Sequence, residues 1–182
     1  MESSAPNDAA SYKVLARSWA ASVTIVTCRR PGPAFTLERP ELDGFTATAF
    51  LTISIDPPII LVSVANGSGA FDLLTDVTAF AVNLLAADQA PVAQEFARTQ
   101  SERGHVFERF AWVPDMAGVP LIGGALGAFS ATVRERIPMG DHLLVLGDVT
   151  QLHRSGRLDT LVYHNRGFGQ VKPHGLSDTP AQ

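Results

Sequence analysis

The chain has 182 residues, of which 46% are hydrophobic and 18% are charged, and its net charge is −4 at pH 7. These totals predict one globular domain over residues 11–172, and they exclude the basic surface that nucleic acid requires. The single cysteine excludes an intrachain disulfide, and the hydropathy pattern predicts no membrane span, no secretory leader and a cytoplasmic protein.

The first half of the chain is predicted to begin with a disordered tail over residues 1–10. An amphipathic helix follows over residues 11–21, with Ser11 as its N-cap. Stretches rich in β-branched residues predict strands over residues 22–28, 44–55 and 59–65. Residues 29–42 carry several prolines and are predicted to form a loop or a weak hairpin. Pro57-Pro58 cannot donate to a ladder, so this pair marks a connection or a sheet edge.

The second half is predicted to be mostly strand. The pattern favours strands over residues 79–84, 126–137, 142–153 and 161–164. Residues 71–74 are predicted to form a helical turn, and residues 89–98 a helix with Asp88 as its N-cap. Residues 101–116 are predicted to be irregular, and residues 173–182 a disordered tail. Because strands mostly follow strands, we expect an antiparallel barrel or sandwich with helices at its edges.

Threonine and alanine alternate from Thr46 to Ala49. Within one strand, Thr46 and Thr48 would point to the same face, and the small Ala47 and Ala49 would let a planar ligand approach the main chain. Exposed N–H groups and hydroxyls there would suit the heteroatoms of a flavin ring. Ordinary strand packing explains the same residues, so composition alone leaves both interpretations open.

Two turns carry further polar groups. Asn66-Gly67-Ser68-Gly69 precedes the predicted helical turn and suits a phosphate, although a plain tight turn is the usual explanation of such a pattern. Gly140-Asp141-His142 places an imidazole beside a carboxylate, which suits substrate orientation or proton transfer; a solvated surface histidine is the alternative. The other histidines lack metal-ligand spacing, and the sequence contains no Gly-x-Ser-x-Gly motif, so we expect no metal site and no serine nucleophile.

Taken in order, these segments resemble the flavin reductase-like family, the split-barrel flavin:NAD(P)H oxidoreductases. The resemblance runs from about Leu15 to Phe168. It is carried by residues 23–27, 44–50, 54–58, 61–64 with Ser68, 80–85, 94–97, 118–126, 140–149 and 163–168. The order of so many segments makes the resemblance specific, because no single segment is decisive.

The resemblance implies a mainly β fold, an antiparallel Greek-key split β-barrel with a few flanking helices. It also implies a homodimer with a flavin in a groove near the subunit interface. The flavin would be FMN, with FAD as the alternative, and NADH or NADPH would be the co-substrate, faced by His142. The cofactor-binding residues that it implies are Thr46, Ala47, Thr48, Ala49, Phe50, Ser63, Val64, Ala65, Asn66, Ser68, Phe96, Tyr163 and Phe168.

The chain departs from the family pattern around the flavin. Ala49 stands where many relatives have a serine, and Ala65, Asn66 and Ala70 replace charged or hydroxyl residues near the phosphate. Three functions remain open: a reductase that supplies reduced flavin to a separate flavin-dependent monooxygenase, an enzyme with tightly bound FMN acting on a small organic substrate, and a non-catalytic flavin-binding protein. The resemblance favours the first, and His142 argues against the third.

Overall fold

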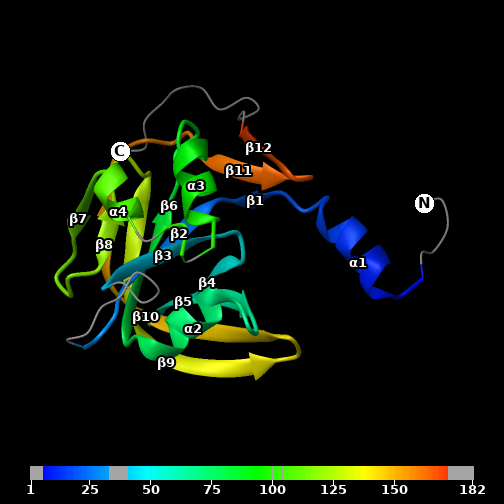
Figure 1. The fold of residues 1–182 in the computed structure, drawn as a ribbon, viewed down its shortest axis with the longest axis horizontal. Helices are drawn as coiled ribbons and strands as arrows, with labels where there is room; N and C mark the ends of the chain where they lie inside the picture. Colours follow the sequence, from blue (N-terminus) through cyan, green and yellow to red (C-terminus); the bar gives the residue numbers. More distant parts are fainter. Residues whose placement is uncertain (1–5, 33–40, 100, 104, 172–182) are drawn as a thin grey trace.

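The computed structural model describes residues 6–32, 41–99, 101–103 and 105–171 (Figure 1). The helices are α1 (Ala9–Ala16), α2 (Gly69–Asp76), α3 (Ala90–Phe96) and α4 (Val106–Arg109). The strands are β1 (Ala21–Ser22), β2 (Thr24–Arg29), β3 (Leu42–Ala47), β4 (Phe50–Ile55), β5 (Pro58–Ala65), β6 (Ala79–Leu84), β7 (Trp112–Pro114), β8 (Pro120–Ile122), β9 (Gly127–Met139), β10 (His142–Arg154), β11 (Leu161–His164) and β12 (Gly167–Gln170).

One antiparallel sheet of seven strands, in the order β3-β2-β6-β9-β10-β5-β4, forms the body of the protein. Its two edge strands, β3 and β4, are consecutive in the chain and are separated only by Thr48 and Ala49. Since three Cα–Cα steps span at most about 11 Å, the sheet has to curl until its two edges approach each other. The fold is therefore a mainly β, split antiparallel barrel, as predicted.

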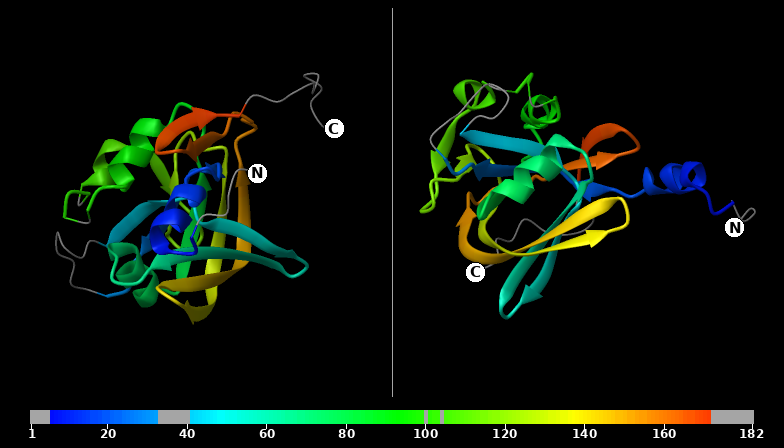
Figure 2. Two further views of the ribbon diagram at one scale, coloured as in Figure 1. Left: turned by 90° about the vertical axis from the view of Figure 1, so that its right-hand side faces the viewer. Right: turned by 60° about the horizontal axis from the view of Figure 1, so that its bottom comes forward.

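The remaining elements flank this barrel. The other strands of the described residues form two small sheets, β1-β11-β12 and β7-β8. The short helices α3 and α4 lie at the end of the barrel near β7 and β8, and α2 packs against β3 and β5 (Figure 1). In contrast, α1 extends away from the barrel and buries none of its residues, and the β4–β5 hairpin also projects (Figure 2).

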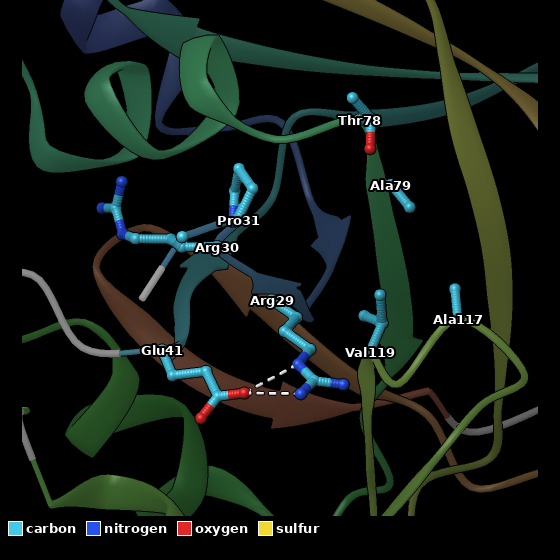
Figure 3. A pocket seen from close by; sticks show the side chains of 9 residues that line it. Arg29, Arg30, Pro31, Glu41, Thr78, Ala79, Ala117 and Val119 are labelled. Carbon is cyan, nitrogen blue, oxygen red and sulfur yellow. Dashed lines mark hydrogen bonds and ion pairs between the residues drawn. The ribbon is translucent and has the colours of Figure 1, made fainter. Parts of the chain in front are cut away.

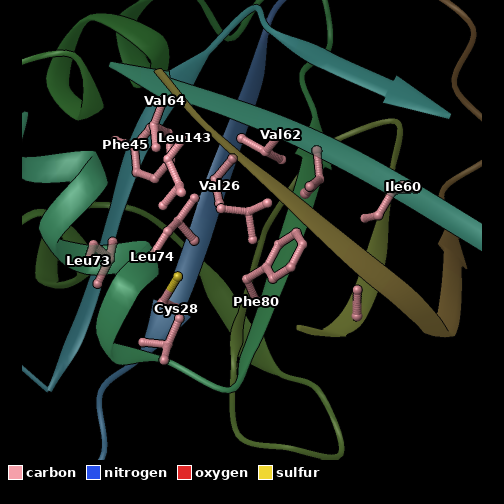
Figure 4. Close-up of a cluster of buried hydrophobic side chains, with 14 residues drawn as sticks. Val26, Cys28, Phe45, Ile60, Val62, Val64, Leu73, Leu74, Phe80 and Leu143 are labelled. Carbon is pink, nitrogen blue, oxygen red and sulfur yellow. The ribbon is translucent and has the colours of Figure 1, made fainter. Parts of the chain in front are cut away.

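Hydrophobic side chains fill both faces of β2. On one face, Val26 and Cys28 belong to the main core, which also contains Phe80 and two leucines of α2 (Figure 4). On the other face, Ile25 joins a second core beneath α3 and α4. This double burial follows from the alternation of side chains along a strand, and it explains why the first five residues of β2, two of them threonines, are all buried.

Close packing in the main core requires a glycine in β10. A Cβ added at Gly147 would lie 2.7 Å from Cζ of Phe80 and 2.9 Å from Cβ of Ala131. Gly147 sits at a register shift between β9 and β10, where the ladder is irregular. The absence of a side chain at this position therefore lets the Phe80 ring, which is fully buried, occupy the middle of the barrel.

Most predicted strands are confirmed, and β6 and β11 have the predicted bounds. The single strand predicted over residues 44–55 is wrong, because the chain bends at Thr48 and starts a new strand at Phe50. The sequence pattern does not reveal this break, since threonine and alanine continue through it. β12 was not predicted, and α4 lies in a region predicted to be irregular.

The predicted helix caps are wrong. α1 begins two residues before Ser11, because the carboxylate of Asp8 accepts hydrogen bonds from N–H of Ala10 and Ser11 at 3.0 and 2.8 Å. Asp88 does not cap α3; its carboxylate instead accepts a hydrogen bond from Arg157 at 2.9 Å. The expectations for residues 1–5, for residues 33–40 of the predicted loop and for the tail over 173–182 lie outside the described residues.

Candidate functional site

A cavity of about 1010 Å³ lies at the split of the barrel. It is lined by α1 and the segment that follows it, the Thr48–Ala49 connection, the start of β4, the middle of β5 and the β11–β12 turn. Cavities of this size accommodate cofactors and drug-sized ligands. Elements from both ends of the chain meet here because β1, which follows α1, pairs with β11.

The Thr48–Ala49 connection is held from both sides. The carbonyl of Ala49 accepts a hydrogen bond from N–H of Ser63 at 3.0 Å, which ties it to β5. One residue before the connection, the carbonyl of Ala47 accepts from the Thr24 hydroxyl at 2.8 Å, which ties it to β2. Thr48 and Ala49 are themselves exposed, so the cavity meets small side chains on a fixed stretch of main chain.

Hydroxyl groups surround this connection. Five of the side chains that line the cavity carry a hydroxyl with no hydrogen-bond partner among the described residues: Ser22, Thr48, Thr52, Ser63 and Tyr163. Apolar side chains complete the wall, including Phe50, whose ring centroid lies 5.5 Å from that of Phe129. An apolar cavity with several unpaired hydroxyls suits a planar heteroaromatic ligand with acceptors and donors along its edges.

Of the residues predicted to bind a cofactor, the structure brings five to this cavity. They are Thr48, Ala49, Phe50, Ser63 and Tyr163. Phe168 lies directly behind, since its ring packs edge-on against that of Tyr163 at 5.4 Å. The predicted set is thus partly assembled around the split, with contributions from three separate segments of the chain.

Thr46 does not share the environment of Thr48. Its hydroxyl donates a hydrogen bond of 2.6 Å to the carbonyl of Ala93 in α3. The expectation that Thr46 and Thr48 share one strand face is wrong, because β3 ends at Ala47 and the alternation stops there. Thr46 therefore fastens a helix to the barrel in this structure.

Three other predicted residues lie away from the cavity lining. Phe96 is fully buried in the second core, where its ring contacts those of Phe107 and Phe110 at 5.4 and 6.4 Å. Val64 is buried in the main core, and the half-buried Ala47 packs against that core. The resemblance that assigned these positions carries no information on which way each side chain of this chain points.

The two polar turns predicted from the sequence lie side by side. Ala65 pairs with His142 across β5 and β10, and N–H of Asn66 donates to the carbonyl of Asp141 at 2.9 Å. Ser68 caps α2, since its hydroxyl accepts from N–H of Phe71 at 3.1 Å and donates to the carbonyl of Ala65 at 2.7 Å. The Ser68 hydroxyl is therefore already engaged, as expected for a plain capped turn.

His142 is half-exposed at the start of β10. Its Nδ1 lies 2.7 Å from a carboxylate oxygen of Asp141, so Nδ1–H donates and Nε2 is the free ring nitrogen. The hydrogen bond from His142 holds the pKa of Asp141 below its usual value, and the positive charge of Lys13 acts in the same direction. Lys13 lines the cavity, whereas Asp141 and His142 are not among its lining residues.

Three cationic residues at the cavity were not predicted. Lys13 comes from α1, Arg17 is the C-cap of that helix, and Arg166 comes from the turn between β11 and β12. Arg166 is about 150 positions away from Lys13 and Arg17 in the sequence, and the pairing of β1 with β11 brings the two segments together. No local motif in the sequence indicates that these cations lie close together, although Asn165-Arg166-Gly167 has the composition of a hairpin turn.

A second, smaller cavity of about 470 Å³ lies at the far end of β2 (Figure 3). Its charged side chains are already engaged with one another or with nearby groups. Arg29 forms an ion pair with Glu41 at 2.7 Å, and Arg30 forms one with Asp76 at 2.9 Å. Within the described ranges, no group of three His, Cys, Asp or Glu side chains could hold a metal ion, and none of the helices has the length and hydropathy to cross a bilayer.

Residues 16–172 match the family described as the flavin reductase like domain. An NADH-dependent flavin reductase from a Rhodococcus species is 38% identical over 140 residues, which cover 77% of this chain and 73% of that protein. The reductase component of a flavin-dependent trigonelline monooxygenase from Acinetobacter baylyi is 31% identical over 156 residues; the match covers 85% of this chain and 47% of that protein, so the chain spans about half of its length.

Solved structures agree with these sequence matches. The NADH:FAD oxidoreductase of Streptomyces globisporus, in complex with NAD and FAD fragments, superposes with a TM-score of 0.81 at 26% sequence identity. The superposition covers 96% of this chain and 99% of that one. The similarity therefore extends over the whole barrel, including the split.

Proposed function

The chain belongs to the flavin reductase-like domain family, and from this premise we propose that it is an NAD(P)H-dependent flavin reductase that supplies reduced flavin to a separate monooxygenase. The observation that carries the proposal is the cavity at the barrel split, where unpaired hydroxyls surround the exposed Thr48–Ala49 connection. The similarity to a reductase component of a two-component monooxygenase supports the role of electron supplier.

The cavity fits an isoalloxazine ring by volume and by chemistry. The ring would lie against Thr48 and Ala49, where small side chains permit close approach to a main chain that Ser63 and Thr24 hold in place. The unpaired hydroxyls of Thr48, Thr52 and Ser63 would satisfy polar atoms along the ring edge, and Phe50 would supply apolar contact. Ala49 supplies no side-chain hydrogen bond, so this site relies on its neighbours.

The flavin phosphate would extend toward Asn66 and Ser68. Because the Ser68 hydroxyl already caps α2, the groups available there are main-chain N–H groups at the start of the helix, at Gly69 and Ala70. Asp72 in the first turn of α2 adds a negative charge that opposes a phosphate. These features support weak retention of the flavin, which suits an enzyme that releases reduced flavin as a product.

Bound NAD(P)H would supply the hydride from nicotinamide C4, and solvent the proton, for reduction of the flavin, with oxidised nicotinamide as the second product. The protein supplies position, orientation and exclusion of water. His142 would orient the nicotinamide through its free Nε2, while Asp141 fixes the ring through Nδ1. Since the pKa of Asp141 is lowered by this hydrogen bond, the carboxylate stays ionised throughout the neutral range and loses its role as hydrogen-bond acceptor for His142 only as the pH falls through that lowered pKa.

We further propose that the protein is a homodimer. Two elements that project from the barrel carry large exposed apolar side chains: Tyr12 and Leu15 on α1 are 73% and 76% exposed, and Ile55 on the β4–β5 hairpin is 94% exposed. Side chains of this size at such exposure are typical of surfaces that a partner covers. A second copy of the chain would bury them beside the cavity, whose wall contains both elements.

The dimer is tested by changing the most exposed of these residues. We expect the wild-type protein to sediment at twice its 19.4 kDa monomer mass, and we expect Ile55→Asp to shift it toward monomer, because a charge would be buried at the interface. The variant Val113→Lys is the matched control, because Val113 is 61% exposed on β7, and it should sediment at the same mass as the wild type. A wild-type protein that sediments as a monomer at micromolar concentration contradicts the proposed homodimer.

The reductase activity is tested by flavin-dependent oxidation of NADH and NADPH. We expect oxidation only when FMN or FAD is added, and a decrease in kcat/KM for the nicotinamide of at least about tenfold in His142→Ala, because the nicotinamide loses its orientation. His105→Ala is the control, since His105 is exposed and pairs with Glu108 outside the cavity. If the wild-type protein oxidises neither nucleotide with either flavin, the proposed function is wrong. A flavin that remains bound through gel filtration would favour the enzyme with tightly held FMN.

The two threonines give a sharper test of the ring position. Thr48→Val should weaken flavin binding about threefold to tenfold, the loss of one hydrogen bond, with little change in stability. Thr46→Val should lower the free energy of unfolding by about 1 kcal/mol, since it removes the bond to Ala93, and should leave flavin affinity unchanged. Fluorescence titration with FMN and urea unfolding measure the two effects. If Thr46→Val weakens flavin binding and Thr48→Val does not, the proposed ring position is wrong.

A further inference from the structure

Three cationic side chains stand at one rim of the cavity without a carboxylate partner. Lys13, Arg17 and Arg166 line the cavity, and none of them has a carboxylate within ion-pair distance among the described residues. Lys13 lies in α1 and Arg17 is the C-cap of this helix, four positions later and still in helical conformation, so the two side chains lie on one face. In a chain whose net charge is −4, such a cluster is a local positive site that attracts an anion.

The main-chain conformation of the β11–β12 turn supports a role for Arg166 beyond solvation. Asn165 and Arg166 have φ angles of 46° and 64°, in the left-handed region. Asn tolerates this region, but at the second position of such a two-residue hairpin turn glycine is strongly preferred. An arginine held there at a steric cost, at the edge of a cavity, marks a position where the side chain serves a ligand.

One main-chain hydrogen bond joins the two segments that carry the three cations. N–H of Asn165 donates to the carbonyl of Arg17 at 2.9 Å, which joins the β11–β12 turn to the end of α1. Trp19, 77% exposed and also part of the cavity lining, follows directly. Its indole offers a flat apolar surface next to the cations, and such a surface can stack on a nucleobase.

We propose that Lys13, Arg17 and Arg166 bind the pyrophosphate of a dinucleotide whose ring lies in the cavity, with Trp19 against its adenine. This inference rests on the proposed function, which places a flavin and a nicotinamide there. The start of α2 is proposed to receive the phosphate of FMN, and these cations would serve a pyrophosphate, the group that a dinucleotide has and FMN lacks. A pyrophosphate joins a ring to an adenosine in FAD and in NAD(P)H, and arginine pairs with phosphate oxygens through two parallel hydrogen bonds.

The test compares dinucleotides with mononucleotides. Single variants Lys13→Gln, Arg17→Gln and Arg166→Asn and the triple variant are titrated with FAD and FMN by flavin fluorescence. The flavin-loaded enzyme is titrated with NAD⁺ and with nicotinamide mononucleotide by calorimetry. Arg166→Asn keeps a residue that accepts the left-handed region, so the turn should remain folded. Arg154→Gln is the matched control, because Arg154 is exposed at the end of β10 and outside the cavity.

We expect the Kd of a dinucleotide to rise about threefold for each single variant and about 30-fold for the triple variant. The Kd of the matching mononucleotide should change less than twofold, and added NaCl should weaken dinucleotide binding more in the wild type than in the triple variant. A Kd that rises for NAD⁺ alone assigns the rim to the nicotinamide dinucleotide. A Kd that rises for FAD alone assigns the rim to the pyrophosphate of FAD, whose flavin phosphate would then lie at the rim and not at the start of α2. Either outcome supports the proposal.

Two outcomes overturn the proposal. In the first, the rim variants leave the Kd of every ligand unchanged. In the second, the Kd rises equally for FMN and FAD and does not rise for NAD⁺, which would mean that the rim binds the flavin monophosphate. Urea unfolding of each variant separates these outcomes from misfolding. The proposed function is judged separately, by flavin-dependent NAD(P)H oxidation of the wild-type protein. A wild-type protein that turns over, with rim variants that bind dinucleotides normally, contradicts this inference alone.

Discussion

The two-residue connection between the edge strands is the constraint on which the fold and the site both depend. β3 and β4 lie at opposite ends of a seven-stranded order, yet Thr48 and Ala49 alone join them. The sheet therefore curls into a barrel that cannot close fully, and the opening falls at this connection. Hydrogen bonds from Ser63 and Thr24 hold the main chain on either side of the opening. A rigid, small-residue surface in an open cavity is thus a consequence of topology.

The site has the properties that a flavin reductase needs and few that other enzymes need. The reaction takes place between two bound nucleotides, so the protein has to place two rings and keep water away, and no protein nucleophile or metal is required. Under the proposed function, unpaired hydroxyls beside the connection, a histidine held by Asp141 and a cationic rim that includes Arg166 would meet these needs from separate parts of the chain. The pairing of β1 with β11 brings the N-terminal segment and the β11–β12 turn to the same cavity.

Much of the fold could be predicted from the sequence because strand periodicity is local. β6 and β11 were located to the residue, and the antiparallel class followed from strands succeeding strands. The break at Thr48 could not be predicted, because the residues that form it also favour strands. For the same reason Thr46 was grouped with Thr48, although it bonds to Ala93. Lys13 and Arg166 escaped notice because their proximity is a property of tertiary structure alone.

The position of the flavin ring is the central claim, and a crystal structure of the protein with bound FMN measures it directly. The account predicts an isoalloxazine lying against the main chain of Thr48 and Ala49, with hydroxyls of the cavity lining at its polar edge. An isoalloxazine bound elsewhere, such as in the cavity beside Arg29 and Glu41, or a split filled by side chains of the protein itself, would contradict it.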